Sequence, residues 1–282
     1  MNILSLQSHV AYGHVGNSAA VFALQRIGVE VWPVHTVQFS NHPGYGAWRG
    51  QAFDAGLVRE TVQGIADRRA FWTCDGVLSG YLGSADVGDA VLDAVAQVKR
   101  ANPRARYCCD PVIGDAGRGV FVQPGVAEFL RERAVRAADV ATPNHFELDH
   151  ITGQTTRTLA EALAAVDDLR ALGPRIVLVT SLATRETPAD AVDVLACDDT
   201  GRFRLRTPKL PIEINGAGDA IAALFFAHGL RGASVSEAAS RATSAVLGIL
   251  ARTANTKARE MLLIEAQEEL VRPSRIFQAE PL

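Results

Sequence analysis

The first candidate for chemistry is a carboxylate that follows two glycines near the C-terminal end of the chain. The segment EINGAGDAIAAL, residues 213–224, places Asp219 directly after Gly216, Ala217 and Gly218 and ahead of a helix-forming run. Main-chain amides at a helix N-terminus bind anions, and a carboxylate beside them can act as a general base. Aspartate is also a common helix cap, so this segment alone leaves both interpretations open.

A second segment, CDPVIGDAGRG, combines two carboxylates with an arginine among glycines. Asp110 and Asp115 offer oxygens of the kind that bind Mg²⁺ or its waters. Arg118 stands on a glycine-rich stretch with little to hold it rigid, and such a loop could fold over phosphates. The alternative is an ordinary strand-to-helix turn in which Asp110 caps the helix and Asp115 is solvated.

A third segment, TPNHFE, brings together Thr142, Asn144 and Glu147. These polar groups could belong to the same site as the two segments above. The alternative is a helix N-terminus with Thr142 at or near the cap and Glu147 in the first turns. From this segment alone, the capping interpretation is favoured.

The elements that must position these groups alternate between short apolar runs and helical patterns, which predicts an α/β fold. Strand-like runs are NILSLQ, VEVWPVHTV, FWTCDGVLSG, RYCCDPV, DVATP and RIVLVTS, and a hairpin is predicted within residues 192–207. Helical periods are clearest over residues 84–100, 159–172, 217–228 and 235–252. We expect one domain over residues 1–282, with helices on both faces of a mostly parallel sheet in three layers.

Polar groups follow nearly every predicted strand. Since ligands in open α/β sheets bind outside the carboxyl ends of the strands, these groups are expected to share one site. In strand order they are Ser8, the QFSNHPGYGAW segment, Tyr81, the two acidic segments above, and the pair Thr180 and Ser181.

Composition excludes several other classes of function. The net charge is −3 and the arginines are scattered, which argues against nucleic acid or an anionic membrane as a partner. There is no uninterrupted apolar stretch of about twenty residues and no basic, apolar leader, so a cytoplasmic location is expected. The four cysteines form no CxxC pair. Cys108 and Cys109 are expected to pack on opposite sides of a strand.

Taken together, these segments resemble the pyridoxal kinases of the ribokinase-like superfamily. The resemblance lies in LQSHVAYGHVGNSAA, VQFSNHPGYGAW, LSGYLG, CDPVIGD, TPNHFE and NGAGDA, which occur in the family's order and span most of the chain. It implies ATP-dependent transfer of phosphate to the 5′-hydroxyl of pyridoxal. Asp219 would accept the hydroxyl proton, and the amides of Gly216, Ala217 and Gly218 would receive the transferring group.

The resemblance also assigns the remaining positions. Those matching the pyridoxal pocket are Ser8, Val15, His42, Pro43, Gly44 and Tyr81. Those matching the ATP site are Asp110, Asp115, Thr142, Asn144, Glu147, Thr180 and Ser181, of which Asp110, Thr142, Glu147 and Thr180 would handle Mg²⁺ and a monovalent cation such as K⁺. Pro43 departs from the family's usual threonine and removes a hydroxyl and a main-chain donor. A homodimer is implied as well.

Three alternatives stay open at this stage. A hydroxymethylpyrimidine kinase shares the fold and the terminal base. A non-catalytic carrier of pyridoxal or its phosphate is a second alternative, which the departure at Pro43 permits. An NAD-linked dehydrogenase is opposed by the chain around Gly13 and Gly16, which lacks the GxG pair that a pyrophosphate needs, and no GxxxxGK[ST] phosphate loop occurs.

Overall fold

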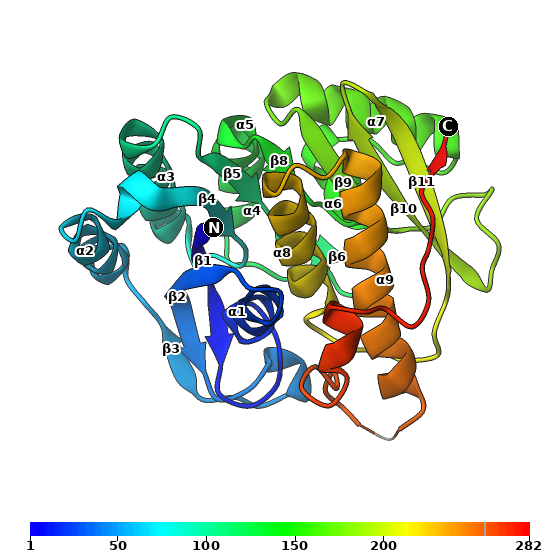
Figure 1. The fold of residues 1–282 in the computed structure, drawn as a ribbon, viewed down its shortest axis with the longest axis horizontal. Coiled ribbons are helices and arrows are strands. Elements are labelled where there is room, and N and C mark those ends of the chain that lie inside the picture. Colours follow the sequence, from blue (N-terminus) through cyan, green and yellow to red (C-terminus); the bar gives the residue numbers. More distant parts are fainter. Residues whose placement is uncertain (257) are drawn as a thin grey trace.

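All of the strands expected from the sequence lie in one ten-stranded sheet, seen in a computed structural model that describes residues 1–256 and 258–282 (Figure 1). The order is β12-β11-β10-β9-β8-β5-β4-β1-β2-β3. The strands from β9 to β2 in this order run parallel, and β3, β10, β11 and β12 pair antiparallel with their neighbours. The bounds are β1 Asn2–Val10, β2 Glu30–Phe39, β3 Gly50–Ala52, β4 Cys74–Ser79, β5 Arg106–Cys109, β8 Val140–Ala141, β9 Ile176–Leu182, β10 Ala191–Asp198, β11 Gly201–Pro208 and β12 Glu280–Pro281. The mostly parallel sheet confirms the predicted fold class.

Helices cover both faces of this sheet. Figure 1 shows α1 (Asn17–Arg26), α8 (Ala217–Leu230) and α9 (Val235–Ala254) on one side. The other face is covered by α2 (Ala55–Ala66), α3 (Ala85–Ala101), α4 (Val126–Phe129), η3 (Leu130–Ala134), α5 (Val135–Ala137), α6 (His145–Thr152) and α7 (Leu159–Leu172). Each side has its own apolar core. Cys108 belongs to the first core and Cys109 to the second, as predicted for neighbours on a strand.

The predicted helices form where their starts are capped. Thr158 and Ser234 each accept a hydrogen bond from the amide three residues later, and the glutamates at those positions bond back to the cap, so α7 and α9 begin with capping boxes. Ser84 caps α3 through the amide of Val87. The four helices expected from apolar periods are confirmed, with small differences at their ends.

Strand ends differ from the sequence expectation at three places. β1 continues to Val10, so Ser8 lies within the strand and not after it. Thr180 and Ser181 are likewise inside β9. The DVATP run forms only the two-residue strand β8. β1 is longer than expected because the polar residues at its carboxyl end do not interrupt the ladder while their main chains stay paired, whereas β8 is shorter than its apolar run.

The strand order reverses direction between β1 and β4. The chain passes from β1 to β2 on one side and returns to β4 on the other, which creates a topological switch point at the carboxyl ends of β1 and β4. Open α/β sheets bind ligands in the crevice outside such a point. No helix in the described part of the chain is long and apolar enough to cross a membrane.

Candidate functional site

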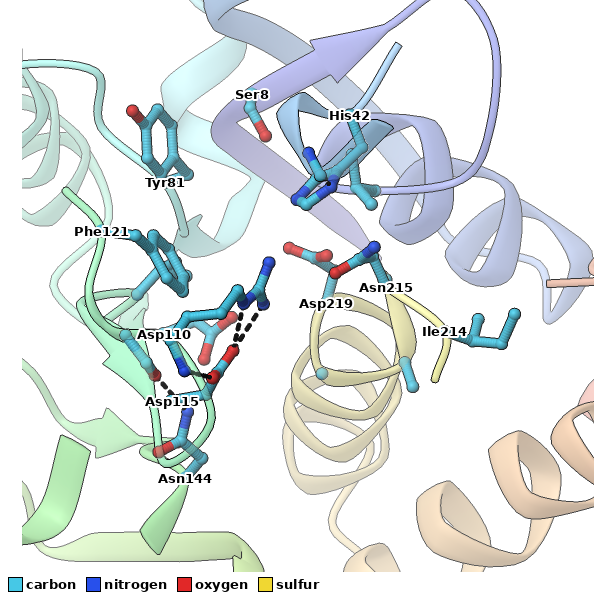
Figure 2. A pocket seen from close by; sticks show the side chains of 18 of the residues that line it. Ser8, His42, Tyr81, Asp110, Asp115, Phe121, Asn144, Ile214, Asn215 and Asp219 are labelled. Atoms are coloured by element: carbon cyan, nitrogen blue, oxygen red, sulfur yellow. Dashed lines mark hydrogen bonds and ion pairs between the residues drawn. The ribbon is translucent and has the colours of Figure 1, made fainter. Parts of the chain in front are cut away.

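A cavity of about 540 Å³ opens at this switch point and gathers every residue proposed for the site from the sequence. Figure 2 shows Ser8, His42 and Tyr81 on one side of it and Asp115 and Asn144 on the other, with the Asp219 carboxylate between the two groups. The remaining predicted members of the lining are Val15, Pro43, Gly44, Asp110, Thr142, Glu147, Thr180, Ser181, Gly216, Ala217 and Gly218.

The N-terminus of α8 points into the cavity and supplies its anion-binding groups. Gly216 is the N-cap, with φ 89° and ψ −11°, and no side chain caps the helix. The amides of Ala217 and Gly218 have no hydrogen-bond acceptor among the described residues. Free amides at the positive end of a fourteen-residue helix attract a phosphate group.

Asp219 occupies the first turn of this helix and does not cap it. Its carboxylate accepts hydrogen bonds from its own amide and from the amide of Gly16, in the loop between β1 and α1. Burial raises the pKa of Asp219 to about 6, because these two bonds offset only part of the cost of placing a charge there. The capping interpretation is therefore wrong for this residue. A carboxyl group with a pKa near neutrality suits a general base.

Two more carboxylates, those of Asp110 and Glu147, line the same cavity. Asp110 and Glu147 are 7% and 4% exposed. Burial raises the pKa of Asp110 well above its usual range, and repulsion from Glu147 and Asp219 raises it further, while the hydroxyl of Thr142 donates to its Oδ1 at 2.9 Å. Burial raises the pKa of Glu147 to about 7, although amides of Asn144, Ile113 and Gly114 donate to it. Electrostatic repulsion of this kind is relieved by a bound cation.

The donor set fits Mg²⁺ held partly through water and phosphate. Among the described residues no group of three or more His, Cys, Asp or Glu side chains encloses a metal. Asp110 and Glu147 thus provide a carboxylate pair, not a complete cage. Mg²⁺ commonly keeps several waters and binds through one or two carboxylates together with substrate phosphates, so the pair is compatible with this ion.

Thr142 is not the cap of α6, contrary to one sequence interpretation. Asn144 takes that position: its side chain accepts from the amide of Glu147 at 2.9 Å, and Glu147 accepts from the amide of Asn144 at 2.8 Å. Thr142 is left to bond Asp110. The Asn144 side chain also donates to the carbonyl of Gly114 at 2.8 Å. Glu147 therefore combines a capping role with a place in the cavity, which the sequence had presented as alternatives.

A short hairpin formed by β6 (Gly114–Asp115) and β7 (Gly119–Val120) forms one wall of the cavity. The Asp115 carboxylate accepts from the amides of Gly117 and Arg118 and forms an ion pair with the Arg118 guanidinium at 2.5 Å. Arg118 also lies over the ring of Phe121, 4.7 Å from its centroid. The sequence suggested a loop with little to hold it; pairing of the two strands and these bonds hold it instead.

The opposite end of the cavity is lined by the ring side chains of His42, Pro43 and Tyr81. The amide of Gly44 donates to Nδ1 of His42 at 3.0 Å, so the neutral ring carries its proton on Nε2. Burial and the nearby Arg118 lower the pKa of His42. Pro43 begins the 3-10 turn η1 (Pro43–Tyr45), where a missing amide leaves no bond unmade. Burial also raises the pKa of Tyr81.

Thr180 and Ser181 border the cavity beside α6. The amide of Thr180 donates to the carbonyl of Pro143 at 3.0 Å, and Thr180 forms a bridge with Asn144. Ser181 has φ 53°, a left-handed conformation that non-glycine residues rarely adopt. Such conformations persist where the surroundings over-determine them and often occur at functional sites.

Several lining residues escaped the sequence analysis. Apolar and amide members found only in the structure are Val10, Phe39, Val112, Phe121, Ile214 and Asn215. Val10 could have been found from strand alternation, since it lies two residues after Ser8. Gly16, which donates to Asp219, was considered only as part of a dinucleotide motif. No local sequence pattern connects Gly16 to Asp219, 203 positions later in the chain.

The fold and the site together define a phosphotransferase of the ribokinase-like class. A family model described as phosphomethylpyrimidine kinase matches residues 51–262. Curated pyridoxal kinases called PdxY from Granulibacter bethesdensis and Rubrobacter xylanophilus are each 54% identical, over 99% and 97% of this chain and 99% and 94% of theirs. The chain belongs to the pyridoxal kinase family.

Solved structures show the same relationship. A pyridoxal kinase from Leishmania donovani in complex with ADP and ginkgotoxin superposes with a TM-score of 0.93 at 31% identity, covering 100% of this chain and 99% of the other. The same enzyme with ADP and pyridoxamine gives 0.92 at 30% identity, with the same coverage. The similarity therefore extends over the whole described fold.

Proposed function

We propose that this protein transfers the γ-phosphate of ATP to the 5′-hydroxyl of pyridoxal, giving pyridoxal 5′-phosphate and ADP. The observation that carries the proposal is Asp219, a carboxylate with a pKa of about 6 directly beside the free amides of Ala217 and Gly218. Phosphoryl transfer requires in-line positioning and neutralisation of charge more than covalent chemistry. The family membership supplies the identity of the alcohol and of the nucleotide.

In this mechanism Asp219 accepts the proton of the 5′-hydroxyl as the oxygen bonds to the γ-phosphorus and the bond to ADP breaks. The amides of Gly216, Ala217 and Gly218 bind the transferring oxygens. Pyridoxal occupies the end lined by Ser8, Val15, His42, Pro43, Gly44 and Tyr81. Nε2–H of His42 would donate to an oxygen on the ring, since Nδ1 is occupied by Gly44.

ATP would extend from the amides of Gly216, Ala217 and Gly218, called here the amide cradle, towards the β6–β7 hairpin and α6. Its phosphates would lie near Asp115, Asn144, Thr180 and Ser181, with Arg118 available to contact them. A second hollow of about 760 Å³ adjoins the cavity and shares Arg118 and Asn215 with it. The hollow is also lined by Gly44, Tyr45 and Arg259, so it lies at the border between the nucleotide end and the pyridoxal end of the cavity.

We assign the cations to the carboxylate pair and its neighbours. Asp110, Thr142, Glu147 and Thr180 would hold Mg²⁺ through its waters, together with a monovalent cation, which we take to be K⁺. The bound ions would supply charge neutralisation for the phosphates. The raised pKa values of Asp110 and Glu147 support this assignment, because burial first, and then the neighbouring carboxylates, disfavour their ionised forms, and a bound cation would offset both effects.

Replacing Asp110 with asparagine should stabilise the ligand-free protein while lowering its activity. The folded-state pKa of Asp110 lies above the unfolded value, so its ionisation penalises the fold at high pH, and the penalty disappears below the unfolded pKa of about 4. The asparagine side chain would carry no such penalty and could still accept from Thr142. We expect a higher melting temperature than wild type at pH 8, by roughly 2–4 °C for each kcal/mol relieved, and a smaller difference at pH 5. Turnover should fall by about tenfold or more.

The measurement is a thermal melt without Mg²⁺ at both pH values, paired with a Mg²⁺-ATP titration of activity. Asp167→Asn is a matched control, since Asp167 makes an exposed ion pair with Arg202 and should change the melting temperature little. A destabilised D110N protein at pH 8 would contradict the assignment, as would unchanged Mg²⁺ dependence.

The function itself is tested by coupled ADP release with pyridoxal, pyridoxine, pyridoxamine and hydroxymethylpyrimidine as separate acceptors. We expect pyridoxal to give the highest kcat/KM. Hydroxymethylpyrimidine is the necessary comparison because the matching family model bears the name of the pyrimidine kinase. Preference for the pyrimidine would overturn the proposed substrate. Tight pyridoxal binding without ADP release would identify a carrier and overturn the proposed reaction.

We further infer one domain over residues 1–282, a homodimer and a cytoplasmic location. A single sheet containing both β1 and β12 supports one domain. Exposed aromatic side chains near the pyridoxal end, Tyr12 at 61% and Trp48 at 45%, are suited to burial against a second copy. The four cysteines are buried and unpaired, which suits a reducing compartment.

A further inference from the structure

We propose that Glu260 is a positioning residue that holds the two loops on the pyridoxal side of the cavity in register with Asp219. The inference rests on the proposed function and adds a residue that the resemblance did not assign. The two loops, called here the ring-side loops, are residues 12–16 between β1 and α1 and residues 42–46 after β2. Glu260 lies beyond α9, far from both in sequence.

Each oxygen of the Glu260 carboxylate binds a different ring-side loop. Oε1 accepts from the hydroxyl of Tyr45 at 2.6 Å, and Oε2 accepts from the amide of His14 at 3.2 Å. The hydrogen bond to Glu260 raises the pKa of Tyr45 to about 12, so the phenol stays a donor. The guanidinium of Arg259 lies 4.5 Å from the centroid of the Tyr45 ring and covers its face.

The backbone of the first loop is shaped to admit this carboxylate. Gly13 has φ +99°, and a Cβ added there would stand 2.5 Å from Oε2 of Glu260. Any other residue would meet both a strained conformation and the carboxylate. The close approach of Gly13 is thus a second observation, independent of the hydrogen bonds, that Glu260 is built into the loop.

Glu260 is followed by buried core residues, whereas residues 42–46 make few hydrogen bonds outside their own turn. Met261 and Leu263, one and three residues after it, are 1% and 0% exposed and pack in the core with α1, α8 and α9. Within residues 42–46 the other hydrogen bonds are local, and among the described residues Tyr45 makes the one bond from that turn to a distant element. The Glu260 carboxylate therefore fixes the position of residues 42–46 relative to the core.

The ring-side loops carry groups that reach the reacting centre. In the first loop the amide of Gly16 donates to Asp219, and the carbonyl of His14 packs directly against Gly216. In the second loop His42 and Gly44 line the cavity. Moving either loop would change the distance between the pyridoxal hydroxyl and its base, and displacement of about 1 Å can cost a hundredfold in rate.

Wild-type enzyme, Glu260→Ala, Glu260→Gln, Tyr45→Phe and the double variant Tyr45→Phe/Glu260→Ala are compared by steady-state kinetics with both substrates and by pyridoxal titration without ATP. We expect Glu260→Ala to raise KM and Kd for pyridoxal about tenfold, the order of loss for a charge-assisted hydrogen bond, and to lower kcat by up to about a hundredfold because the hydroxyl is misplaced relative to Asp219. KM for ATP should stay within about twofold. Glu260→Gln should recover most of the loss, because its amide can accept from His14 and donate to the phenol oxygen.

Tyr45→Phe should have a smaller effect than Glu260→Ala, and no further effect in its presence, since the phenol then has lost its partner. Glu268→Ala is the control, as Glu268 pairs with Arg26 on the same C-terminal segment and should leave both KM values unchanged. If Glu260→Ala does not fold, the kinetics of Tyr45→Phe test the positioning role, because this variant keeps the Glu260 carboxylate. A raised KM for pyridoxal in Tyr45→Phe would support the role, and an unchanged KM would contradict it.

Equal rises in both KM values, or full additivity of the two substitutions, would overturn the positioning role. Unchanged pyridoxal binding in a folded Glu260→Ala protein would do the same. Failure of the wild-type enzyme to phosphorylate pyridoxal would instead count against the proposed function, so the two failures are separable.

Discussion

Replacing Asp219 with asparagine is expected to lower kcat by about 10²- to 10⁴-fold without lowering the melting temperature. This is the usual contribution of one general base. Asparagine preserves the size of the side chain and an oxygen that can accept from the amide of Gly16, so the loop and the start of α8 should stay in place. The measurement is single-turnover formation of pyridoxal 5′-phosphate at saturating ATP. Full activity in this variant would remove Asp219 from the mechanism.

The pH dependence provides an independent signature of the same residue. Asp219 must be ionised to accept a proton, and burial sets its pKa at about 6. At saturating Mg²⁺, which keeps Glu147 ionised, the wild-type kcat/KM should therefore fall as the pH drops through about 6, and this acidic limb should vanish in Asp219→Asn. An Asp115→Asn variant is a useful comparison, because its ion pair with Arg118 is lost while the acidic limb should remain. An unchanged limb in Asp219→Asn would assign the titration to another group.

The sequence was sufficient to predict where the cavity lies because a parallel sheet brings strand ends together. Polar residues after separate strands, such as Ser8, Asp110 and Thr142, were predicted to meet at one edge, and the structure places them in one cavity. The prediction needed only the order of apolar runs and the rule for carboxyl ends. Small errors at the ends of strands did not affect it.

Whether the polar residues of TPNHFE cap a helix or line the cavity was harder to predict. TPNHFE contains two possible caps, and only the fold shows that Asn144 caps α6 while Thr142 bonds Asp110. Glu147 satisfies both interpretations at once. A capping motif predicts only hydrogen bonds between neighbouring residues. Which side-chain oxygens of this segment face the cavity depends on how α6 packs against β9 and the β6–β7 hairpin.

Contacts between distant segments could not be predicted at all. Gly13 and Gly16 were judged as parts of a nucleotide motif, for which their spacing is wrong. The actual constraint on Gly13 is the carboxylate of Glu260, more than two hundred residues away, whereas Gly16 is crowded by the carbonyl and hydroxyl of Ser8 in the preceding strand. Glycine at these positions is required by the backbone conformation and by close approach, and neither requirement is visible in the neighbouring residues.

Replacing Gly216 with alanine should abolish most activity and also destabilise the protein. Gly216 has φ +89°, a left-handed conformation that costs a residue with a Cβ about 1–2 kcal/mol. The added Cβ would also overlap the carbonyl oxygen of His14, which is main chain and cannot rotate away. Relieving the overlap must displace either the start of α8 or the loop that bears Gly16. We expect a loss of about 2–5 kcal/mol in the free energy of unfolding.

Gly218 offers the matched comparison because it differs from Gly216 in both respects. It has no positive φ, and a Cβ there would meet nothing within 4 Å. Gly218→Ala should therefore keep the wild-type melting temperature, and any loss of activity would report only the space needed by the phosphate. Gly216→Ala should lose at least about a hundredfold in kcat, since displaced amides no longer face the transferring group. Equal melting temperatures and equal rates for the two variants would contradict this prediction. They would show that α8 tolerates a side chain at its N-cap, and that the positions of its free amides do not depend on contact with the β1–α1 loop.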